Sequence, residues 1–156
     1  MKKVASLLSI IMVISMLAGC QLSRTPIDAD MFKTEAEATG YTVTETTNIY
    51  PDGTVGICQI AIKNSDSIEY QIEFVTVPTV EQAKTIYQEK YSEYESRKGL
   101  GSSSYSSVSS WNYSYYRLTT NGRYYVVSRT SNTFLYVESS EEYKGEIADF
   151  VRSIGY

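Results

Sequence analysis

WNYSYYRLTTNGRYYVVSRT, residues 111–130, is the stretch that decides the fold of this chain. Two runs rich in Tyr, Thr and Val flank the pair Asn121-Gly122, and these residue types favour strands. An Asn-Gly pair between two such runs is the strongest short-range signal for a two-residue hairpin turn, because both residues adopt a positive φ readily. The stretch therefore predicts an antiparallel hairpin made of strands 111–120 and 123–130.

Strand patterns continue on both sides of this hairpin. Ser131-Asn132 marks a turn into a further strand, 133–138. In the first half of the chain, one strand begins at Tyr41, and Asp52-Gly53 is a hairpin turn pair before strands 54–63 and 67–77. In 67–77 apolar and polar side chains alternate, which predicts a sheet with one apolar face and one solvated face.

Helix signals follow each group of strands and also precede the first group. Asp28 and Gly40 delimit a helix over 29–39. Capping boxes predict the starts of two further helices, Thr79 with Gln82 for 80–98 and Ser139 with Glu142 for 140–154. The order α, βββα, βββα suggests a duplicated unit and an α+β fold. We expect one domain, 28–156, with about six antiparallel strands and the helices packed on one face.

Residues 99–110 separate the two halves and contain seven serines. Little apolar surface is available in this segment, which predicts a flexible surface loop. The segment lacks the GxxxxGK[ST] pattern of a phosphate-binding loop.

The residues that usually carry catalysis are sparse. The chain has no histidine, and Cys58 is expected to be a small core residue of a strand. Glu69 and Glu73 share a strand face but stand about 13 Å apart by strand rise, too far for paired glycosidase carboxylates, so a solvated face is the simpler interpretation. No metal-ligand or cofactor pattern is present. We therefore expect no enzyme activity, no metal and no cofactor.

The N-terminus has the layout of a secretory signal. Lys2 and Lys3 precede an apolar run, 4–17, which is too short to span a bilayer. The run ends in Leu17-Ala18-Gly19-Cys20, which resembles the lipobox of bacterial lipoproteins. This resemblance implies that residues 1–19 are a signal peptide and that Cys20 carries a diacylglyceryl group. It also implies a short tether, 20–27, and a location on the outer side of the cell membrane.

Loss of the signal leaves 12 basic and 18 acidic residues, a formal net charge of −6. This charge argues against nucleic acid as a partner. The chain also resembles small, Tyr-rich lipoproteins of Gram-positive gut bacteria, through Gly40-Tyr41 and the terminal Ile154-Gly155-Tyr156. That resemblance implies no particular activity.

Tyrosine is unusually frequent, with 15 residues. Alternation places Trp111, Tyr113 and Tyr115 on one sheet face, and we expect Tyr125 of the neighbouring strand to join them. Exposed amphipathic rings suit the binding of an envelope glycan, peptide or protein. Tyrosine is also simply a favourable strand residue whose hydroxyl reaches water at a sheet edge, and the structural interpretation is the simpler one. A structural envelope protein that dimerises through its sheet and an unfamiliar hydrolase remain alternatives to a binding domain.

Overall fold

The computed structural model of the chain describes residues 23–64, 66–99 and 103–156. These residues form an α+β domain with one antiparallel sheet, so the predicted fold class is confirmed. The lipobox, 17–20, lies outside the described residues. The elements are α2 (Ala29–Ala38), β1 (Tyr41–Ile49), β2 (Val55–Lys63), β3 (Tyr70–Thr76), α3 (Val80–Ser96), β4 (Ser103–Ser109), β5 (Tyr113–Thr120), β6 (Arg123–Thr130), β7 (Thr133–Ser140), the 3-10 turn η1 (Glu141–Tyr143) and α4 (Lys144–Ser153).

The sheet has seven strands in the order β1-β2-β3-β7-β6-β5-β4. Each half of the chain forms a meander, and the two meanders join where β3 pairs with β7 in antiparallel register, Phe74 opposite Leu135. The second meander has one strand more than the first. The predicted duplication of a three-strand unit therefore describes the first half better than the second.

The additional strand is β4, and the prediction of a flexible loop over 99–110 was wrong for this part. Ser103–Ser109 pair residue by residue with β5 at the edge of the sheet. Hydroxyl contacts reinforce this pairing at both ends: Ser103 Oγ lies 2.9 Å from Thr120 Oγ1, and Ser109 Oγ lies 3.3 Å from Ser114 Oγ. An edge strand is held by backbone hydrogen bonds on one side and needs little apolar burial, so composition alone missed it.

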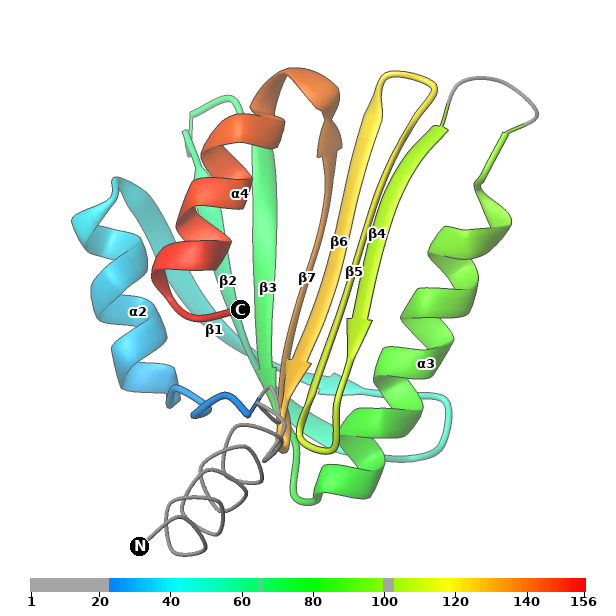
Figure 1. Cartoon of the computed structure of the whole chain (residues 1–156). Coiled ribbons are helices and arrows are strands. Elements are labelled where there is room, and N and C mark those ends of the chain that lie inside the picture. The colour runs from blue at the N-terminus through cyan, green and yellow to red at the C-terminus, as the bar shows by residue number, and fades with distance from the viewer. Residues whose placement is uncertain (1–22, 65, 100–102) are drawn as a thin grey trace, which may run out of the picture.

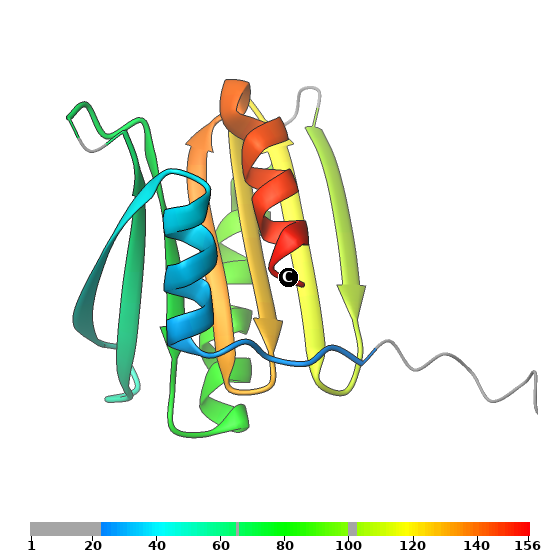
Figure 2. The same cartoon turned by 90° about the vertical axis from the view of Figure 1, so that its left-hand side faces the viewer.

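The helices cover both faces of the sheet, and the expectation of a single covered face was wrong. Figures 1 and 2 show α2 and α4 on one face and α3 on the other. Phe32 of α2 and Ile147 of α4 share one core cluster. Tyr87 and Tyr94 of α3 belong to another cluster, with Leu118 of β5. The reason lies in β6, whose residues after Arg123 are all buried, so neither of its faces is solvated.

The helix-cap and hairpin-turn signals of the sequence were confirmed in part. Asp28 accepts a hydrogen bond from the backbone N–H of Met31 at 2.8 Å, and Thr79 accepts one from Gln82 at 3.2 Å. Asn121 and Gly122 have φ values of 51° and 71°, as the hairpin turn requires.

The capping box predicted at Ser139 was wrong. Ser139 is the penultimate residue of β7 and pairs with Tyr124, because the ladder between β6 and β7 continues to the Asn121-Gly122 turn. The backbone N–H of Glu141 then donates to Gly122 O at 2.9 Å. Helix α4 consequently begins later, after η1 and without a side-chain cap.

Candidate functional site

The aromatic residues that the sequence placed together are divided in the structure. Tyr113 is 2 % exposed on the face that α4 covers, and the Arg24 guanidinium lies 4.1 Å from the centre of its ring. Burial raises the pKa of Tyr113, and the charge of Arg24 partly offsets this. Tyr125 is 5 % exposed on the opposite face, where its ring lies 5.0 Å from that of Tyr94. Trp111 is 64 % exposed in the turn between β4 and β5, and Tyr115 is half-buried on the α4 side.

One part of the predicted face is nevertheless open. In Figure 2, β4 and the neighbouring part of β5 stand beside α4 with no helix in front of them. On this side of the sheet the register pairs Ser104 with Thr119, Ser106 with Arg117, and Val108 with Tyr115. We call these six residues the open strip. It contains one half-buried aromatic ring, one exposed guanidinium and four smaller side chains, of which three carry hydroxyls. Of these six residues Thr119 is buried.

A polar pocket of about 500 Å³ continues the open strip beyond Ser104 and Thr119. The turn between β5 and β6 and the start of η1 and α4 complete it. The remaining lining residues are Thr120, Asn121, Gly122, Glu141 and Lys144. Hydroxyl, amide, carboxylate and ammonium groups thus surround one space, a set that can donate and accept hydrogen bonds to a polar ligand. Sequence analysis missed this pocket because one of its walls is β4.

A second polar pocket, of about 280 Å³, lies between α3 and the centre of the sheet. Two carboxylates line it, Glu73 and Glu138. Glu73 accepts hydrogen bonds from the Tyr136 hydroxyl, from Gln71 Nε2 at 3.1 Å and from the Cys58 thiol at 3.7 Å. Three donors from the sheet thus hold one carboxylate. Glu69 precedes β3 and contacts Asn64 Nδ2 at 3.2 Å, so Glu69 and Glu73 do not form a joint site.

The thiol beside Glu73 is poorly suited to nucleophilic attack. Cys58 is fully buried. Burial, together with the nearby Glu73 carboxylate, raises the pKa of its thiol to about 12. The reactive form of a cysteine is the thiolate, which is scarce at neutral pH when the pKa is so high. Cys58 is therefore a packed core residue of β2, as the sequence predicted.

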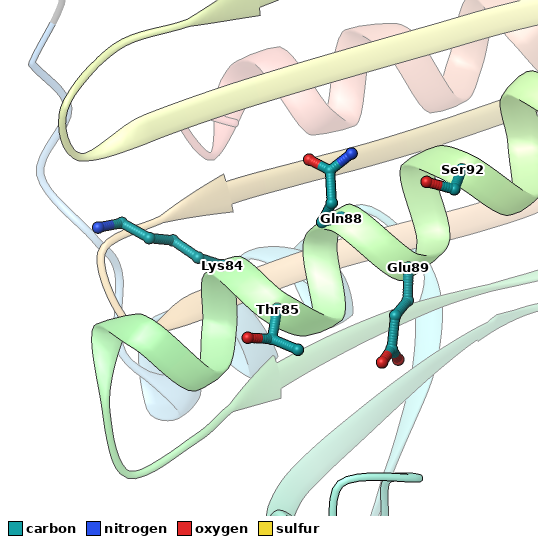
Figure 3. A pocket seen from close by; sticks show the side chains of 5 residues that line it. All are labelled: Lys84, Thr85, Gln88, Glu89 and Ser92. Atoms are coloured by element: carbon teal, nitrogen blue, oxygen red, sulfur yellow. The ribbon is translucent and has the colours of Figure 1, made fainter.

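An open hollow of about 760 Å³ lies along α3, as Figure 3 shows. Lys84, Thr85, Gln88, Glu89 and Ser92 line it. Figure 3 shows Gln88 pointing to one side of the helix and Thr85 and Glu89 to the other. Because these side chains diverge, they do not present a common set of groups to a small ligand.

The described ranges offer neither a cluster of metal ligands nor a membrane-spanning helix. Residues 23–64, 66–99 and 103–156 contain no group of three His, Cys, Asp or Glu side chains able to hold a metal ion. In that part of the chain no helix is both long and apolar enough to cross a membrane.

No known protein family matches the chain, and no curated protein sequence matches it. A solved structure does match: a GTP-binding regulator from Thermotoga maritima, with a TM-score of 0.50 and 16 % sequence identity. The match covers 84 % of this chain and 88 % of that protein. At this identity the similarity shows a shared fold alone.

Proposed function

We propose that the protein is a lipoprotein of the cell membrane, anchored through Cys20 and facing outward, whose domain binds an envelope glycan, peptide or protein without catalysing a reaction. The observation that carries the binding role is the open strip with its polar pocket, which lie beside α4 where no helix covers the sheet. The anchoring role depends on Leu17-Ala18-Gly19-Cys20.

The lipid supplies the membrane affinity in this proposal. Each buried methylene of an acyl chain contributes about 0.8 kcal/mol, so two chains on Cys20 anchor a protein stably where one binds reversibly. The segment between Cys20 and α2 is short, and Arg24 fastens it to the domain. The Arg24 guanidinium donates to Gly155 O at 2.6 Å, and Arg24 O accepts from Asn112 Nδ2 at 2.8 Å.

Among glycan, peptide and protein ligands, the chemistry of the open strip favours a glycan, which carries many hydroxyl groups. Tyr115 offers part of a ring face, against which the apolar side of a sugar can pack, and its neighbours offer hydroxyl groups and the Arg117 guanidinium. The pocket next to the strip adds Glu141 and Lys144, which can hydrogen-bond to sugar hydroxyls or to a peptide backbone.

Two measurements test the two roles separately. Cys20→Ser removes the thiol that would carry the lipid, so the variant should move from the membrane fraction to the medium. Membrane retention equal to that of the wild type would contradict the anchoring role.

For the binding role, purified Cys20→Ser protein and a Tyr115→Ala, Arg117→Ala version of it are incubated with isolated cell-wall glycan and sedimented. The double variant should bind at least about tenfold more weakly, since one aromatic contact and one charged hydrogen bond together contribute about 2 kcal/mol. Tyr105→Ala is the matched control. Tyr105 is a β4 residue that pairs with Leu118 of β5, but its side chain is 62 % exposed on the α3 side of the sheet, away from the open strip. Equal binding by all three proteins would contradict a binding role for the open strip.

Dimerisation through the sheet remains a second candidate, and one observation favours it. In the sheet order β4 is an end strand, with β5 as its only neighbour among the described strands. The outer side of an edge strand can pair with a second chain. Sedimentation of the Cys20→Ser protein over a wide concentration range distinguishes the two, because only dimerisation predicts a mass that rises with concentration.

A further inference from the structure

The point at which the chain leaves the domain toward Cys20 lies beside one particular turn. Asn112, in the turn between β4 and β5, accepts a hydrogen bond from the backbone N–H of Arg24 at 3.4 Å and donates one to Arg24 O at 2.8 Å. Four residues of fully extended chain span at most about 14 Å, so a lipid on Cys20 would hold Arg24 and this turn within about 14 Å of the anchored sulfur. Trp111 is the residue before Asn112 and is 64 % exposed.

Other turns and helix starts lie at the same end of the domain. The backbone N–H of Ser131, between β6 and β7, donates to Asn112 O at 2.8 Å. Asn132 in turn donates through Nδ2 to Val77 O at 2.9 Å, just before α3. Figure 1 shows the start of α2, the turn between β1 and β2, the start of α3 and the turn between β4 and β5 together at the lower end, where the coloured part of the chain begins.

Exposed apolar side chains gather on these segments. Ile49 is 77 % exposed and Val55 51 % exposed at the hairpin between β1 and β2, Met31 is 52 % exposed in the first turn of α2, and Val80 is 37 % exposed at the start of α3. With Trp111, we call these residues the apolar end. Isolated exposed apolar residues are ordinary, but a group of them at the end that bears a lipid anchor needs a specific reason. At the far end, the turn between β2 and β3 carries Ile68, which is 57 % exposed and serves below as a control.

We propose that the apolar end rests on the phospholipid bilayer that holds the Cys20 lipid, with Trp111 in the interfacial region. This inference rests on the proposed lipid anchor. Trp side chains favour the membrane interface, where the ring lies among acyl chains and the indole N–H reaches water or headgroups. The lipid keeps the apolar end next to the membrane, so weak apolar contacts suffice to orient the domain.

Charge does not assist this contact. Asp28, Asp30, Asp52 and Glu81 lie on the same segments as the apolar end, and the mature chain has a net charge of −6. Anionic lipid should therefore weaken the contact, and a neutral phosphatidylcholine bilayer should favour it.

The orientation has a consequence for the open strip. β5 runs from Tyr113, next to the apolar end, to Thr120 at the polar pocket. The seven residue steps from Tyr113 to Thr120 rise about 3.3 Å each, so with β5 upright on the bilayer the pocket lies about 23 Å farther from it than Tyr113. The pocket would then face the cell wall and not the headgroups, with the open strip along the side of the domain.

The test uses Trp111 as its own probe, because it is the only tryptophan in the chain. Mature lipidated protein is reconstituted in phosphatidylcholine vesicles, with and without phosphatidylcholine brominated near the headgroup end of its acyl chains. The inference predicts that brominated lipid quenches Trp111 emission and that acrylamide quenching falls about twofold relative to the Cys20→Ser protein in solution, because the interface shields the ring. Ile49→Ser should reduce quenching by brominated lipid, whereas the control Ile68→Ser should leave it unchanged.

The outcomes separate the inference from the function on which it rests. Protein that partitions into vesicles but shows full acrylamide access and no quenching by brominated lipid would overturn the inference and leave the anchor intact. Wild-type protein that fails to partition into vesicles would contradict the anchor itself. Shielding of Trp111 from acrylamide without lipid quenching, increasing with protein density, would mean that a second copy covers the apolar end, and would also overturn the inference.

Discussion

Replacing Tyr113 by alanine tests whether the tyrosines of β5 serve the core or a binding surface. The ring is 2 % exposed and lies under the Arg24 guanidinium at 4.1 Å. Truncation of a buried aromatic side chain to alanine costs about 3–5 kcal/mol. Loss of the partly desolvated cation–π contact accounts for about 0.5–2 kcal/mol of that cost. We expect Tyr113→Ala to lower the free energy of unfolding by about 4 kcal/mol, near the middle of this range.

The matched control is Trp111→Ala, two residues away and 64 % exposed. An exposed substitution of this kind changes the free energy of unfolding by about 0.5 kcal/mol or less. Both variants are made in the Cys20→Ser background and unfolded by heat and by urea. For a domain of this size we expect a melting temperature about 10–20 °C lower for Tyr113→Ala and nearly unchanged for Trp111→Ala.

A double-mutant cycle isolates the contribution of Arg24. The coupling free energy between Arg24→Ala and Tyr113→Ala should be about 0.5–2 kcal/mol, because the two side chains contact each other directly. Equal melting temperatures for Tyr113→Ala and Trp111→Ala would refute the assignment of Tyr113 to the core. A coupling free energy of zero would refute the role of Arg24 in covering the ring.

Two further predictions concern pH and backbone conformation. Burial raises the pKa of Tyr41 and of Tyr156 to about 12, against 10.0 for an ordinary tyrosine. The neutral hydroxyls therefore contribute stability that is complete below about pH 10 and is lost as the pH rises through about 12, so ionisation of Tyr41 and Tyr156, seen as the absorbance change that Tyr41→Phe and Tyr156→Phe variants lack, should coincide with loss of circular dichroism; ionisation of these two hydroxyls near pH 10 in a folded domain would contradict this. Gly122→Ala should destabilise the domain by about 1–2 kcal/mol because φ is 71° there, whereas Gly145→Ala in α4, with no atom within 4 Å of the added Cβ, should stabilise it by about 0.5–1 kcal/mol; urea unfolding that shows the same sign for both variants would contradict the assigned conformations.

Much of the fold could be predicted because turn and cap signals are local. Asn121-Gly122 determines both the turn and the register of its hairpin, since a two-residue turn places Thr120 opposite Arg123. The same register places Tyr125 opposite Leu118, and residues directly opposite each other share a face of the sheet. The sequence therefore contained the information that Tyr125 lies with Leu118 and not with Tyr113, although alternation within each strand alone does not show it.

The remaining differences depend on pairing and packing that no local pattern reports. The serines of β4 carry no apolar signal, because an edge strand is recognised by its partner β5 and not by its own composition. One feature of the sequence indicates that α3 lies on the face opposite α2 and α4. The consecutive apolar residues Tyr124 to Val127 are typical of a strand that is buried on both faces. The polar pocket beside the open strip could not be predicted, because it is formed only when β4, the hairpin turn and η1 meet.

The state of the two cysteines in the purified mature protein tests the central claim, the lipid anchor on Cys20, most directly. Cys58 is a free, buried thiol and Cys20 is the other cysteine in the chain. After unfolding and alkylation, mass spectrometry should find an N-terminal peptide that begins at Cys20 and carries a diacylglyceryl group, with the alkyl label on Cys58 alone. An N-terminus at another residue, or an alkylated and lipid-free Cys20, would contradict the account.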